Sequence, residues 1–191
     1  MDKTYRTEFR RVFLLADLPA PLTRASEHLQ IFDNYIENTR LRLRSIRVPR
    51  AKEWFWILQQ LNQINPTDLS GWEVSEIHLS EAEHQALESF EGREVRKNER
   101  VETNELRFNR YSFPINDKPV TIDFFLNPLW GLILAKVFFQ TIEEMHAFSA
   151  PDFFLQEVTQ NKIFLGLNLV GKTFAETRKA MENGKRKVEN G

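Results

Sequence analysis

Three arginines alternate with two leucines over Arg40–Arg44, and their spacing is the strongest chemical signal in the sequence. Successive side chains of a β-strand point to opposite faces, so the three guanidinium groups would share one face. Like charges on one face repel, and a fold tolerates them most easily where water or an anionic ligand meets them. This segment therefore predicts a cationic sheet face. Phosphate oxygens are one ligand for such a face, because guanidinium groups bind them bidentately. An exposed strand with solvated arginines is the alternative interpretation.

The rest of the chain predicts the scaffold that would position these arginines. Short alternating or aromatic-rich segments between turns predict about eight strands and a few helices, and short turns favour antiparallel pairing. Strands with one charged and one apolar face suit a closed barrel with a wet interior, whose apolar face packs outward against helices. The predicted strands cover residues 8–15, 29–37, 40–46, 53–60, 72–78, 106–113, 121–126 and 132–140.

Turn and cap signals separate these strands. Pro66, Asp68 and Gly71 predict a loop over 61–71. Ser80 opens the sequence Ser-Glu-Ala-Glu, a capping box that predicts a helix running to about Phe90. A short helix is expected over 141–146, and the segment from there to about residue 177 mixes helical and loop signals.

Composition limits the classes of function. The chain has 191 residues, 41% of them hydrophobic, which suits one globular domain over 1–175 followed by a polar tail over 176–191. A net charge of −1 gives no overall bias toward nucleic acid or membrane, and we expect neither as a partner. The chain lacks cysteine, and its first residues are charged rather than apolar, so we expect a cytoplasmic protein. The sequence leaves the oligomeric state open.

Five segments, in order and spacing, carry a family resemblance: residues 8–13 (Glu-Phe-Arg-Arg-Val-Phe), 40–44, 108–111 (Phe-Asn-Arg-Tyr), 123–125 (Asp-Phe-Phe) and 135–138 (Ala-Lys-Val-Phe). Together they resemble the CYTH family, which includes class IV adenylate cyclases and thiamine triphosphatases. The resemblance implies an α+β fold, the triphosphate tunnel: a mainly antiparallel eight-stranded β-barrel with flanking helices.

The chain departs from the family pattern at the metal ligands. The family holds divalent metal with two glutamates of the opening motif and with glutamates of the last strand. Here the second opening glutamate is Arg10, and the last-strand pair is Lys136 and Phe138. Glu8 and Asp123 are the acidic positions that remain, so they are the metal candidates if Mg²⁺ or Mn²⁺ binds. No cofactor is firmly implied.

The departures extend to the cations of the tunnel. Val12 and Phe108 stand where the family has lysines, whereas the arginines of the alternating strand are kept. The predicted inward set has six cations and two carboxylates, so such an interior would favour an anion over a metal. The predicted phosphate-binding residues are Arg10, Arg40, Arg42, Arg44, Arg110 and Lys136.

Three functions follow from this resemblance. The first is a tunnel protein that binds a phosphate-rich small anion, such as a triphosphate, polyphosphate or nucleotide, with little or no metal-dependent catalysis. The second is an active metal-dependent triphosphatase or adenylate cyclase-like enzyme with altered ligands. The third is a catalytically dead scaffold or partner-binding protein, in which Arg10 and Lys136 pair with Glu8 and Asp123 and close the site. The catalytic residues stay unknown in each case.

Overall fold

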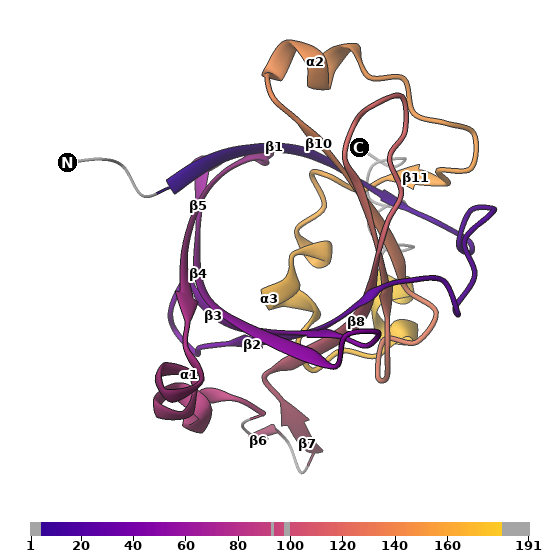
Figure 1. Cartoon of the computed structure of the whole chain (residues 1–191). Helices are drawn as coiled ribbons and strands as arrows, with labels where there is room; N and C mark the ends of the chain where they lie inside the picture. The colour runs from indigo at the N-terminus through magenta and orange to yellow at the C-terminus, as the bar shows by residue number, and fades with distance from the viewer. Residues whose placement is uncertain (1–4, 93, 98–99, 181–191) are drawn as a thin grey trace.

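Eight strands close into an antiparallel barrel in the computed structural model, which describes residues 5–92, 94–97 and 100–180 (Figure 1). Hydrogen-bonded neighbours follow the order β10-β9-β8-β2-β3-β4-β5-β1, and β1 pairs back onto β10 to close the ring. The predicted fold class is therefore confirmed. The barrel strands are β1 Tyr5–Leu14, β2 Leu29–Tyr35, β3 Leu41–Val48, β4 Glu53–Asn65, β5 Asp68–Leu79, β8 Glu105–Ser112, β9 Val120–Phe125 and β10 Ile133–Phe139.

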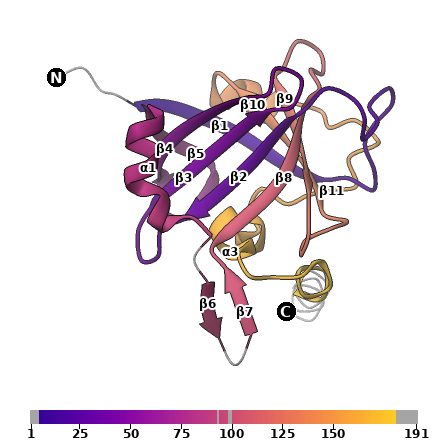
Figure 2. The ribbon, with the colours of Figure 1, turned by 60° about the horizontal axis from the view of Figure 1, so that its bottom comes forward.

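The remaining elements decorate the barrel or enter it. The helix α1 starts at the predicted capping box, in which the Ser80 hydroxyl accepts from the Glu83 amide. The hairpin β6–β7 projects from the end of the barrel in Figure 2, whereas α3 lies within the outline of the ring in Figure 1. These elements are α1 Glu81–Leu87, η1 Glu88–Phe90, β6 Glu94–Lys97, β7 Arg100–Thr103, α2 Ile142–Ala147, β11 Gln156–Glu157, η2 Lys162–Phe164 and α3 Gly166–Leu169.

The loop expected over 61–71 is wrong: β4 runs to Asn65 and β5 starts at Asp68, so the turn is tight. The Asn65 side chain accepts hydrogen bonds from the backbone amide and hydroxyl of Thr67, which satisfies the turn locally. Pro66 sits in the turn, outside the strand ladder, where its missing N–H costs nothing. The two strands are thus longer than their turn-forming residues predicted.

Two other segments differ from expectation. The hairpin β6–β7 and the short strand β11 were not predicted. The expected polar tail begins inside a helical segment over 174–180, where the Thr173 hydroxyl accepts from the Glu176 amide. Residues 181–191 of that tail lie outside the described residues.

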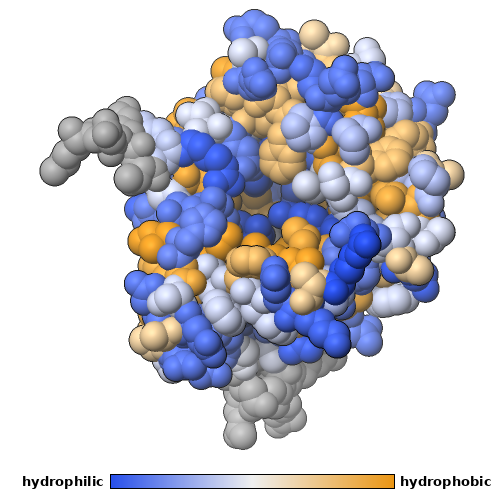
Figure 3. All heavy atoms as spheres, in the orientation of Figure 1, coloured by the Kyte–Doolittle hydropathy of each residue, from blue (hydrophilic) through white to orange (hydrophobic). Residues whose placement is uncertain are grey.

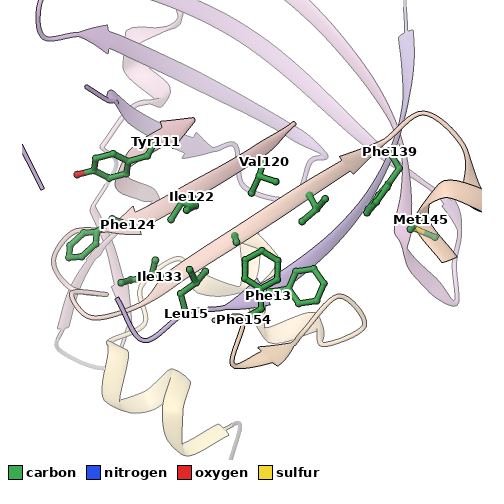
Figure 4. Packing of buried hydrophobic residues seen from close by; sticks show 12 residues of the cluster. Phe13, Leu15, Tyr111, Val120, Ile122, Phe124, Ile133, Phe139, Met145 and Phe154 are labelled. Carbon is green, nitrogen blue, oxygen red and sulfur yellow. The ribbon is translucent and has the colours of Figure 1, made fainter. Parts of the chain in front are cut away.

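One hydrophobic cluster covers the outer face of β1, β8, β9 and β10 (Figure 4). Phe13 and Leu15 of the β1 side meet Ile122, Ile133 and their neighbours there. The cluster also includes Met145 and Phe154, from α2 and the segment after it. This face matches the expected apolar exterior covered by other elements.

A second hydrophobic cluster lies inside the barrel, contrary to the expected wet interior. It joins the inward-facing Val12, Leu106 and Phe108 to Phe164 and Leu169 of the C-terminal segment. The segment enters because the Val158 amide donates to the Val12 carbonyl at 2.8 Å and Thr159 accepts from the Val12 amide at 2.9 Å. Apolar side chains therefore fill part of the lumen and reduce its open volume.

Within the part of the chain that the structure describes, every helix is too short or too polar to cross a lipid bilayer.

Candidate anion-binding site

The open part of the lumen is a cavity of about 530 Å³, seen as a hollow in the face shown in Figure 3. Inward positions alternate along β3, so Arg42 and Arg44 face this cavity, and Arg40, just before the strand, lines it too, as the spacing predicted. Their exposure decreases with depth, from the exposed Arg40 through the half-buried Arg42 to the buried Arg44. The cationic side chains that line the cavity are Arg6, Arg10, Arg40, Arg42, Arg44, Arg110 and Lys136.

Asp33 on β2 organises the two deeper arginines of β3. The Arg44 guanidinium donates to Asp33 through Nε at 2.6 Å and Nη2 at 2.7 Å, and Arg42 Nη1 donates to it at 3.0 Å. Burial alone would raise the pKa of Asp33, but Arg42 and Arg44 outweigh it and lower this pKa to about 2. The carboxylate therefore stays ionised at neutral pH.

Arg42 is held by three different acceptors. Its Nε donates to Gln59 at 2.8 Å, and Nη1 donates to the Tyr35 hydroxyl at 3.3 Å as well as to Asp33. The acceptors belong to β2 and β4, the two strands that flank β3. The guanidinium plane is thus fixed before any ligand arrives.

Asp123 on β9 organises a second cationic pair. Arg110 donates to it through Nε at 2.7 Å and Nη2 at 2.8 Å, and the Lys136 ammonium donates at 2.7 Å. Burial would raise the pKa of Asp123, but Arg110 and Lys136 hold it well below its usual range. Burial lowers the pKa of Lys136 to about 8, with Asp123 opposing and the nearby Arg110 and Arg10 adding to the decrease.

Arg10 on β1 pairs with Glu8 and contacts an aromatic ring. Its Nη1 donates to Glu8 at 2.8 Å, and its guanidinium lies 5.0 Å from the centre of the Trp72 ring. The buried Nε of Arg10 has no hydrogen-bond partner among the described residues. Burial lowers the pKa of Arg10, while Glu8 opposes that shift. A buried donor without a partner is costly, so the position of Arg10 is maintained at the expense of this group.

The cavity mouth carries the remaining charges. Arg6 pairs with Glu76, and Glu76 also accepts a hydrogen bond from Gln59. Arg6 Nη2 lies 3.6 Å from Glu8 Oε2. Arg40 donates to Asn62. Seven cations therefore face the four carboxylates of Glu8, Asp33, Glu76 and Asp123, an excess of three positive charges. The sequence predicted an excess of four, because it missed Arg6, Asp33 and Glu76.

The missed residues have identifiable sequence signals. Asp33 and Tyr35 are two residues apart on a predicted strand, so their side chains lie on the same face of the sheet. Glu76 lies at an inward position of the strand that pairs with β4. Pairing partners across strands cannot be read from one strand alone, which is why these carboxylates were not assigned.

The acidic residues present do not fit a metal site. Glu8 pairs with Arg10 at 2.8 Å, and Asp123 is bonded by Arg110 and Lys136. Across residues 5–92, 94–97 and 100–180, no three His, Cys, Asp or Glu side chains gather closely enough to hold a metal ion. A divalent ion would have to displace cations from each candidate carboxylate.

Two solved structures resemble this chain over most of its length. The crystal structure of the inorganic triphosphatase NE1496 is 22% identical, with a TM-score of 0.54 over 86% of this chain and 95% of that chain. A second structure, of the hypothetical protein NE1496, is also 22% identical, with a TM-score of 0.55 over 87% of this chain and 99% of that chain. No family model matches the chain, and no curated protein matches it.

The closed eight-stranded barrel matches the triphosphate tunnel fold of these neighbours. The fold that the sequence resemblance implied is therefore present.

Proposed function

We propose that this protein binds a phosphate-rich small anion inside its barrel, with little or no metal-dependent catalysis. The observation that carries the proposal is the excess of cations around one cavity, in which three positive charges are left after every carboxylate has been counted. The likeness to a triphosphatase fold supports a ligand of this class.

The arrangement suits an anion because the cations are fixed in advance. The guanidiniums of Arg44 and Arg110 are each held by a bidentate carboxylate, so little side-chain freedom is lost when a ligand binds. The site also excludes part of the solvent, which strengthens each charge interaction relative to water. Arg10 and Lys136 come from the neighbouring strands β1 and β10 and face the β3 arginines as one charged set.

The paired state of Glu8 and Asp123 supports the non-catalytic form of this proposal. Phosphoryl transfer requires neutralisation of charge on the leaving oxygens, commonly by Mg²⁺ held on carboxylates. Here the cations Arg10 and Lys136 already occupy those carboxylates. The protein's own cations would bind the ground-state anion without a metal.

A second candidate function, a scaffold that has lost ligand binding, is favoured by the apolar cluster inside the barrel. Phe108 and Leu134 fill space there beside Lys136. A scaffold of this kind would keep the barrel and lose the affinity for phosphate.

Calorimetry with tripolyphosphate separates these functions. We expect wild-type protein to bind it, and Arg10→Met to weaken binding at least tenfold because a charged donor is removed from the cavity. Arg50→Met is the matched control, since Arg50 is an exposed arginine outside the cavity, and it should leave binding unchanged. Absence of wild-type binding would support the scaffold instead.

A phosphate-release assay on the same samples tests the catalytic alternative. We expect no release from tripolyphosphate, ATP or thiamine triphosphate beyond the background hydrolysis, with or without Mg²⁺. Sustained metal-dependent release that Arg10→Met abolishes would establish an enzyme.

A further inference from the structure

We propose that the anion is an organic phosphate whose phosphate end binds the arginines and whose other end is apolar. This inference rests on the proposed function and names the class of ligand that the same cavity takes. It follows from a cluster of apolar side chains in the cavity wall.

Part of the wall formed by β4 and β5 is apolar. Leu61 pairs in register with Val74, and both side chains line the cavity together with Leu69 and Trp72. Leu165, next to α3, packs against this same group. The cationic residues Arg42, Arg44 and Arg110 belong to other strands, whereas Arg6 on β1 pairs in register with Val74 at the edge of this apolar group.

Leu167 extends the apolar surface to the mouth. Its side chain lines the cavity and is 55% exposed, in an element that otherwise packs inside the barrel. The backbone amide of Leu61 donates to the carbonyl of Arg40, so Leu61 also lies beside the most exposed of the three alternating arginines. We define Leu61, Val74, Leu165 and Leu167 as the apolar collar.

The collar adjoins Arg10, one of the cations that line the cavity. The Arg10 guanidinium lies over Trp72, and Trp72 belongs to the same hydrophobic group as Leu61, Val74 and Leu165. A phosphate bound at Arg10 would therefore direct its ester group along the collar. A bare polyphosphate would leave the collar in contact with water, whereas an aliphatic group would bury it.

The size of the effect follows from burial of the ester group. Each methylene that leaves water for an apolar surface increases affinity by about fourfold. A chain of several carbons on the phosphate should therefore bind at least tenfold tighter than the same phosphate bearing a methyl group.

Calorimetry with geranyl diphosphate and methyl diphosphate, in the presence of a chelator, tests this inference. We expect geranyl diphosphate to bind at least tenfold tighter. Leu167→Ser should weaken geranyl diphosphate about threefold to tenfold and leave methyl diphosphate unchanged, because the phosphate contacts are intact. The control is Leu155→Ser, a leucine that is 63% exposed and does not line the cavity, which should change neither ligand.

The outcomes separate this inference from the proposed function. Equal affinity for the two diphosphates, or a tighter complex with ATP than with geranyl diphosphate, overturns the apolar ligand class and leaves anion binding in place. Binding of neither diphosphate nor of tripolyphosphate overturns the proposed function itself. Binding of uncharged geraniol as tightly as geranyl diphosphate also contradicts it, since the arginines would then contribute nothing.

Discussion

Among single residues, Asp33 has the largest role in orienting the arginines Arg42 and Arg44 that line the cavity. It is 2% exposed and accepts three hydrogen bonds from Arg42 and Arg44, so both guanidiniums depend on it for their orientation. A buried carboxylate of this kind is worth little as a net source of stability, but its removal leaves buried cations without a counter-charge.

Asp33→Asn should therefore destabilise the fold by about 3–5 kcal/mol at pH 7. The folded pKa of Asp33 is about 2, below its ordinary value of 3.8, so its contribution is present above pH 4 and is lost as the pH falls toward 2. Urea denaturation of both proteins should show their difference in unfolding free energy shrinking by about 2 kcal/mol over that range. A difference that stays constant with pH would contradict this role.

Lys136 gives the binding site a pH dependence. Its pKa in the empty cavity is about 8, and a bound anion would favour the protonated form. The affinity for tripolyphosphate should therefore fall as the pH rises above 8, by up to about tenfold per pH unit. Lys136→Met should remove this part of the pH dependence, and the titration of the ligand itself is common to both proteins. Parallel pH profiles for the two proteins would show that Lys136 does not contact the anion.

Among the elements, α3 lies inside the barrel, and its first residue, Gly166, closely approaches Tyr35 at the end of β2. A Cβ atom at Gly166 would lie 1.8 Å from the hydroxyl oxygen of Tyr35 and 2.7 Å from its Cζ, so only glycine fits this position. The Tyr35 hydroxyl in turn accepts a hydrogen bond from Arg42, so Tyr35 connects α3 to the arginines that line the cavity.

Gly166→Ala should lower the free energy of unfolding by about 1–3 kcal/mol, because the methyl group must displace Tyr35 or α3. The same substitution in a Tyr35→Ala background should cost clearly less, since the clashing ring is gone. A double-mutant cycle by chemical denaturation measures the difference. Equal costs in the two backgrounds would mean that the contact is not the source of the loss.

The barrel strands were more predictable than the segment inside them. The alternation of Arg40–Arg44 is local, so the strand and its inward face follow from the sequence alone. The segment 158–170 has leucines at positions 165, 167 and 169, a spacing that is not helical, and its place is fixed by contacts with β1. Those contacts join residues far apart in the sequence, so no local sequence pattern could predict them. The same reason explains why Glu76 and its partners at the mouth were missed.

At the scale of the whole molecule, charge is separated between lumen and exterior. The chain has a net charge of −1 and its cavity has an excess of three cations, so the rest carries an excess of four negative charges. The composition alone could not show this, because opposite charges cancel in the total. The closure of β1 onto β10 places Arg10 beside Lys136 and completes the ring of strands around the cations.

Ligand binding should stabilise the whole barrel, because the cations that line the cavity come from the four strands β1, β3 (with Arg40 just before it), β8 and β10. At a tripolyphosphate concentration of 100 times the dissociation constant, the gain is about 2.7 kcal/mol. For a domain of this size that corresponds to a rise in Tm of about 5–10 °C, measurable by scanning calorimetry. Sulfate at the same ionic strength controls for general salt effects, and an equal rise with sulfate would argue against a specific site.

The most direct test of anion binding without metal is the dissociation constant of tripolyphosphate measured twice by calorimetry. One titration contains a chelator and the other contains Mg²⁺ at millimolar concentration. We predict binding in chelator, with an affinity at least as high as in Mg²⁺, because the metal competes with the protein for the anion. Binding that appears only when Mg²⁺ is added would contradict the account.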